Sequence, residues 1–177
     1  MFDFLTSTKR PAAGAPVLSG AQVLERLNVL NHDAAPWRIV DGASEGVDLV
    51  AEWKILDPAW YEVFAKAGLT TAFKILLKLD EHKKHVRAQD RQYDVSWDTG
   101  VPVLSACVSK GQGAQFQYSS SYALKKGLSF EKEYEYSFNT SEIKKPVQAA
   151  VVACGWVYKG VMFGWVFEGF SFGFGEP

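Results

Sequence analysis

The chain has 177 residues, of which 47% are hydrophobic and 14% are aromatic, and its 19 basic and 20 acidic residues give a formal net charge of −1. This length suits one domain, which can bury roughly 70% of the surface of the unfolded chain without disulfides or metal ions. The near-neutral charge offers no general attraction to nucleic acid, so nucleic acid is not an expected partner. The high aromatic content favours a fold rich in β-strands.

We predict a flexible leader over residues 1–18, because residues 6–18 are rich in Ser, Thr, Pro, Ala and Gly. Residues 19–177 are expected to form a single globular domain. The acidic Asp3 and the lack of an apolar run argue against a secretory signal. Cys107 and Cys154 lie in apolar runs, where buried, reduced thiols are expected. A cytoplasmic location follows as the prediction.

Two helices are predicted in the first half of the domain. An amphipathic helix begins after Ser19, which can cap it, and its apolar residues recur at helical spacing. A short helix is expected near residues 58–67, where Asp57 is the cap, Pro58 occupies the first helical position and Gly68 ends the helix.

From Trp37 onward, apolar and polar residues alternate in about seven successive runs, which predicts antiparallel strands joined by short turns. That number is enough for a strongly curved or barrel-like sheet. In the run from Val86 to Trp97, the inward positions change from even to odd numbers. We therefore predict a β-bulge between Gln89 and Gln92.

An apolar C-terminal helix is predicted near residues 142–154, and the sheet is expected to enclose it or pack on it. The fold class is therefore α+β, with an antiparallel, strongly curved or barrel-like sheet and three helices. Lys159 and Glu168 interrupt the apolar stretch from residue 147 to residue 174, so no transmembrane span is expected.

The segment "SEIKKPVQAAVVACGWVYKGVMF", residues 141–163, has an acidic residue, a branched apolar residue and a lysine that lead into a small-residue helix and an aromatic strand. It resembles the tubby C-terminal-like superfamily, which includes phospholipid scramblases and LURP-one-related proteins. The resemblance implies a β-barrel around a hydrophobic helix, and association with lipid or a membrane surface. The chain lacks the cysteine-rich stretch and the calcium loop of scramblases, so no functional residue is transferred.

A basic strip is predicted on the polar face of two neighbouring strands, with Lys74 and Lys78 on one strand and Arg87 and Arg91 on the next. Such a strip can meet phosphates or lipid headgroups. The alternative is that these residues form the ordinary solvated face of a sheet, and the acidic residues between them favour this interpretation. We expect a non-enzymatic binding domain, with an anionic lipid or a protein as the partner.

The alternative function is an enzyme with a polar site near the predicted bulge. Asp90 and Asp94 share a strand face and, with His85, are weak catalytic candidates. His82 and His85 lie in a predicted turn, so they are not expected to bind a metal, and the sequence indicates no cofactor.

A third hypothesis concerns the C-terminus, where Phe170, Phe172 and Phe174 alternate with small residues. This spacing predicts a strand that carries three rings on one face. The strand either closes the sheet of its own domain or docks on a partner chain, as in a subunit of an assembly. The sequence indicates no oligomeric state.

Overall fold

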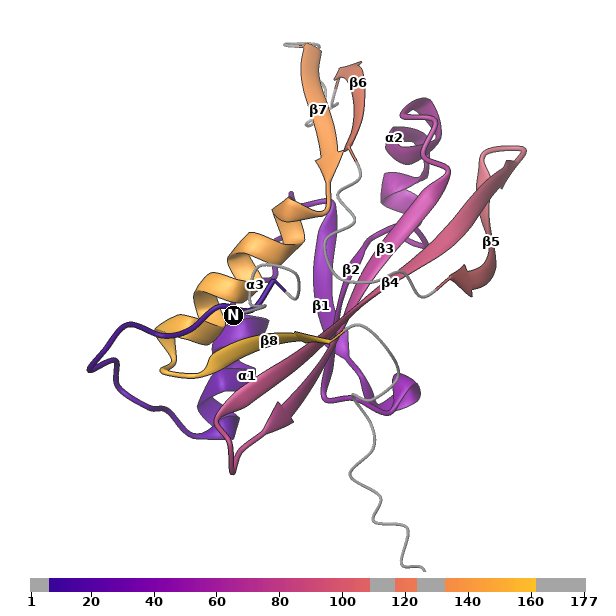
Figure 1. The fold of residues 1–177 in the computed structure, drawn as a ribbon. Helices are drawn as coiled ribbons and strands as arrows, with labels where there is room; N and C mark the ends of the chain where they lie inside the picture. The colour runs from indigo at the N-terminus through magenta and orange to yellow at the C-terminus, as the bar shows by residue number, and fades with distance from the viewer. Residues whose placement is uncertain (1–6, 109–116, 124–132, 162–177) are drawn as a thin grey trace, which may run out of the picture.

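The computed structural model describes residues 7–108, 117–123 and 133–161. The fold is α+β, with a curled antiparallel half-barrel sheet and a few short helices (Figure 1). This architecture confirms the predicted fold class.

The main sheet has the strand order β1-β2-β3-β4-β5, and β8 lies beside β4. The bounds of these strands are Trp37–Asp41 (β1), Leu49–Trp53 (β2), Thr71–Asp80 (β3), His85–Asp98 (β4), Val101–Val108 (β5) and Val157–Val161 (β8). The pair formed by β4 and β8 is parallel, whereas the other pairs of this sheet are antiparallel. Alternation within one strand carries no information about its partner, so this parallel pair was not predicted.

A second, two-stranded sheet is formed by β6 (Gln117–Ala123) and β7 (Glu133–Asn139), which are antiparallel. In Figure 1 this hairpin projects at the top of the molecule, away from the main sheet. The chain then enters α3 (Ser141–Ala153), which leads to β8.

The predicted helices are present. Helix α1 (Gly20–Asn28) begins at Ser19, whose side chain and that of Gln22 form a reciprocal capping box. The side chain of Asp57 caps the 3₁₀ turn η2 (Pro58–Trp60), which leads into α2 (Tyr61–Lys66). Another 3₁₀ turn, η1 (Ala43–Glu45), lies between β1 and β2.

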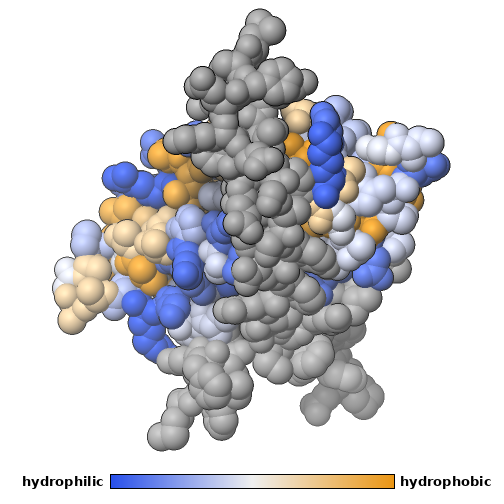
Figure 2. Space-filling model, turned by 90° about the horizontal axis from the view of Figure 1, so that it is seen from above, coloured by the Kyte–Doolittle hydropathy of each residue, from blue (hydrophilic) through white to orange (hydrophobic). Residues whose placement is uncertain are grey.

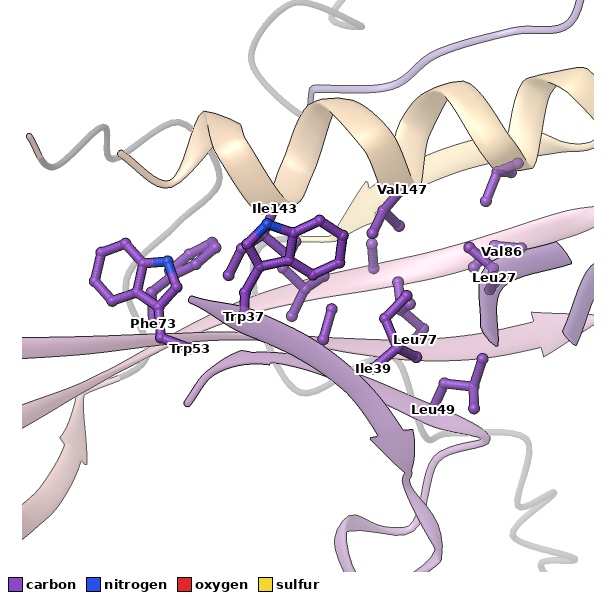
Figure 3. Close-up of a cluster of buried hydrophobic side chains, with 14 of the residues drawn as sticks. Leu27, Trp37, Ile39, Leu49, Trp53, Phe73, Leu77, Val86, Ile143 and Val147 are labelled. Atoms are coloured by element: carbon purple, nitrogen blue, oxygen red, sulfur yellow. The ribbon is translucent and has the colours of Figure 1, made fainter. Parts of the chain in front are cut away.

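The main core lies between α1, α3 and the inner face of the sheet, as Figure 3 shows. Leu27 of α1 and Ile143 and Val147 of α3 are fully buried against strand residues such as Leu77. Helix α3 buries one stripe of side chains, while Ala149 and Ala153 on its other side are exposed. The sequence left open whether the sheet encloses this helix or packs on it, and in the structure the helix packs on the sheet.

The predicted β-bulge is wrong in position. The register between β4 and β5 shifts between Tyr93 and Val95, whereas β3 and β4 pair without interruption along their shared length. Asp90 and Gln92 are buried polar residues. Because the alternation of apolar residues could not assign these two side chains to the inner face, the change of face was predicted too early.

Residues 7–18 lie along β8 and the end of α3. Lys9 and Tyr158 exchange two backbone hydrogen bonds of 2.9 Å, and the amide of Leu18 donates to the carbonyl of Cys154 at 3.1 Å. Gly155 has a φ of +73°, and a Cβ at this position would lie 2.4 Å from the carbonyl oxygen of Pro16. These contacts place this part of the leader on the domain, while its flexibility stays a prediction.

Candidate functional site

The basic strip, Lys74, Lys78, Arg87 and Arg91, lies on the outer face of the main sheet, away from α1 and α3. Lys74 is directly opposite Arg91, and Lys78 is directly opposite Arg87. The structure therefore brings the four side chains together as two cross-strand pairs of like charge.

A further cation extends one of these pairs. Lys159 of β8 is in register with Arg87, so Lys78, Arg87 and Lys159 form a row across three adjacent strands, the cation row. Lys159 is exposed. Sequence reasoning missed Lys159 because β8 and β4 are far apart in the chain and pair in parallel.

Like charges directly opposite one another destabilise a sheet unless other groups offset them. In this protein acids lie beside each residue of the basic strip. Their closest N···O distances are 3.5 Å for Lys74 with both Glu45 and Glu52, 3.5 Å for Lys78 with Asp48, 2.7 Å for Arg87 with Asp80 and 3.2 Å for Arg91 with Glu45. Lys159 has no ion-pair partner in the part of the chain that the structure describes.

His85 lies at the same end of the outer face, two residues before Arg87. Burial lowers the pKa of His85, and the positive charge of Lys159 lowers it further. Asp80 opposes this shift, whereas Lys83 and Arg87 add to it by smaller amounts. Its Nδ1 atom is buried and makes no hydrogen bond with the described residues. The positive charge of Lys159 thus acts on His85, and both lie at the end of the outer face that carries the cation row.

The three catalytic candidates are not brought together. Asp90 faces the inner side of β4, where it is buried and forms an ion pair with Lys144 of α3. Asp94 is exposed at the irregularity in β4, and His85 lies on the outer face. Each candidate thus has a different environment.

The structure also shows a buried polar cluster around Asp90 that sequence reasoning missed. Tyr158 of β8 is fully buried, and burial, then the negative charge of Asp90, raises the pKa of its phenol well above the usual value. Its hydroxyl makes no hydrogen bond within the described ranges. The sequence signal for this cluster is Lys144, a basic residue just before the apolar body of α3, which pairs with the buried Asp90.

The remaining predictions concern ligands and the C-terminus. Phe170, Phe172 and Phe174 lie outside the described residues. Among residues 7–108, 117–123 and 133–161, no helix is long and apolar enough to cross a membrane. The same ranges contain no group of three or more His, Cys, Asp or Glu side chains arranged to hold a metal ion.

The surface of the described part carries both polar and apolar residues. On the face seen from above, hydrophilic and hydrophobic residues are interspersed over the described part (Figure 2), which is usual for a protein surface. Comparisons of the chain with models of protein families, with curated proteins and with solved structures find no match.

Proposed function

We propose that this chain is a non-enzymatic domain that binds phosphorylated lipid headgroups at a membrane surface through its cation row. The observation that carries the proposal is the alignment of Lys78, Arg87 and Lys159 on three adjacent strands. Lys159 is exposed and has no acidic partner among the described residues, so an external anion can offset its charge.

Two further observations support a binding role. Lys159, Lys83 and Arg87 lie close enough to His85 for their positive charges to lower its pKa, so several cations gather at the same end of the sheet. The resemblance of residues 141–163 to the tubby C-terminal-like superfamily implies the same kind of ligand.

The proposal is tested with vesicles of phosphatidylcholine, with and without phosphatidylserine. We expect binding only to the anionic vesicles, and release as salt is added, because salt screens exposed charges. Lys159→Glu should weaken binding by about 30-fold, since each basic residue near an anionic membrane contributes about 1 kcal/mol and the reversal changes the charge by two units.

The matched control is Lys145→Glu, which makes the same change in net charge at an exposed position on α3, on the other side of the sheet. It should bind almost as well as the unmodified protein. Inorganic phosphate added as a competitor separates the two sources of the ligand: a site for free phosphate is blocked by it at low concentration, whereas a headgroup site is not. Failure to bind anionic vesicles at low salt, or equal losses in both variants, would contradict the proposal.

A further inference from the structure

The loop between β1 and β2, residues 42–48, folds over the outer face of the sheet. Its Val47 is buried against Val50 of β2 and Leu76 of β3, in a small apolar cluster separate from the main core. Gly46, with a φ of +73°, supplies the left-handed turn after η1. This path places two acidic side chains of the loop on the basic strip.

Glu45 joins the two cations of one cross-strand pair. Its Oε1 lies 3.5 Å from Nζ of Lys74, and its Oε2 lies 3.2 Å from Nη1 of Arg91. Each carboxylate oxygen therefore meets a cation from a different strand. An external carboxylate or phosphate group would be bound by the same two cations in the same way.

The two acids of the loop differ in how they are held. Asp48 pairs with Lys78 and also accepts a hydrogen bond of 2.7 Å from the amide of Leu79, so it is part of the sheet. Within the part of the chain that is described, the ion pairs and hydrogen bonds of the Glu45 carboxylate are those with Lys74 and Arg91. Unlike Asp48, the Glu45 side chain can thus move without breaking a hydrogen bond to a backbone amide.

The side chains of this group are partly exposed to solvent. The exposed fractions are 27% for Glu45, 25% for Arg91 and 18% for Lys74. Because Lys74 also pairs with Glu52 and lies 5.0 Å from the ring centre of Tyr93, its position does not depend on Glu45. When Glu45 moves away, Lys74 therefore keeps its place, and the pairing of β3 with β4 keeps the backbone of Arg91 directly opposite it.

We infer that Lys74 and Arg91 form a second anion-binding site, in which the carboxylate of Glu45 is an internal occupant that an external phosphate group replaces. This inference rests on the proposed function, because it makes the basic strip a continuation of the cation row. The loop then limits the affinity of the surface for anions, and movement of Glu45 exposes the second site.

The test uses Glu45→Gln, which removes the charge and keeps the shape of the side chain. Binding to phosphatidylserine vesicles should become about fivefold tighter, since one negative charge is removed from the surface. The control is Glu25→Gln, the same change at an exposed position on α1, on the other side of the sheet; it should leave binding nearly unchanged. In the double variant Glu45→Gln/Arg91→Gln the gain should disappear.

A second measurement needs no vesicles. In Glu45→Gln, Lys74 and Arg91 lose the acid that bridges them, so inorganic phosphate should raise the melting temperature of this variant more than that of the unmodified protein or of Glu25→Gln. If Glu45 is only a structural bridge, Glu45→Gln is less stable and phosphate does not restore it, which overturns the inference.

The two proposals fail in different ways. If the unmodified protein binds anionic vesicles and Glu45→Gln binds no better than Glu25→Gln, the second site is refuted and the proposed function stands. If no variant binds vesicles but phosphate selectively stabilises Glu45→Gln, the second site is supported as a phosphate site and the membrane proposal is contradicted.

Discussion

Asp90 and Lys144 form an ion pair between β4 and α3, with 7% and 13% of their side chains exposed. Both charged groups have lost most of their contact with water, and each offsets part of the cost of burying the other. Tyr158 is buried nearby, and its pKa is raised by burial and then by the negative charge of Asp90. At the scale of residues, the first catalytic candidate is therefore a structural contact between helix and sheet.

This assignment predicts the outcome of a double-mutant cycle. Asp90→Asn and Lys144→Met should each lower the free energy of unfolding by about 3 kcal/mol, because each removes the ion pair and leaves a buried charge less well compensated. The double variant should lose clearly less than the sum, which urea unfolding of the four proteins will measure. Additive losses would show that the two charges do not depend on one another.

The turn between β3 and β4 contacts the start of α1 and the segment between α3 and β8. Oε1 of Glu81 accepts a hydrogen bond of 3.1 Å from the amide of Gly20, the first residue of α1. Lys84, which has a φ of +52°, places its ammonium group 5.2 Å from the ring centre of Trp156 and 3.4 Å from Glu81. At the scale of elements, this turn holds the start of α1 against the sheet.

A pH dependence follows from the Glu81 contact. The hydrogen bond from Gly20 lowers the pKa of Glu81 below the usual value of 4.5, and Lys84 adds to the effect. The folded protein therefore binds the Glu81 proton less readily than the unfolded chain, so the contact stabilises the fold above pH 4.5 and is lost as the pH falls through the lowered pKa. The denaturation midpoint of Glu81→Gln should lie below that of the unmodified protein at pH 7, and the difference should shrink at pH 3.5.

The control for this experiment is Glu25→Gln, which removes one charge from the exposed side of α1, the helix whose first residue Glu81 contacts. A difference between Glu81→Gln and the unmodified protein that stays constant from pH 7 to pH 3.5 would contradict the role of the Glu81 charge.

The half-barrel divides along β4. Strand β8 pairs with His85 to Gln89, and β5 pairs with Gln92 to Asp98. On the side of β4 away from β3, the two partners thus occupy opposite ends of one long strand, and they diverge in Figure 1. At the scale of the molecule, this fork ties the C-terminal half of the chain to the hairpin of β3 and β4.

The predicted C-terminal strand gives a prediction at the same scale. If Phe170, Phe172 and Phe174 close the domain's own core, deletion of residues 170–177 should lower the free energy of unfolding by at least about 3 kcal/mol, the cost of removing one buried aromatic side chain. Deletion of residues 175–177 is the control and should have little effect. A folded monomer of unchanged stability after the longer deletion would favour docking on a partner.

Local patterns were sufficient to predict the helices, the strands and the shared face of the basic strip. Ser19 and Asp57 cap helices through contacts with residues a few positions away. Lys74 and Arg91 belong to two strands joined by one short turn, so alternation places them on one face. In each case the interaction that determines the structure lies within a short stretch of chain.

Tertiary structure decided the rest. The ion pair of Asp90 depends on the position of Lys144 in α3, the position of Lys159 beside Arg87 depends on a parallel pair, and the Glu45 bridge depends on the path of a loop. Each of these arrangements requires contact between segments far apart in the sequence. Hydrophobic periodicity reports which face of an element is buried, and it carries no information about which distant charge lies opposite.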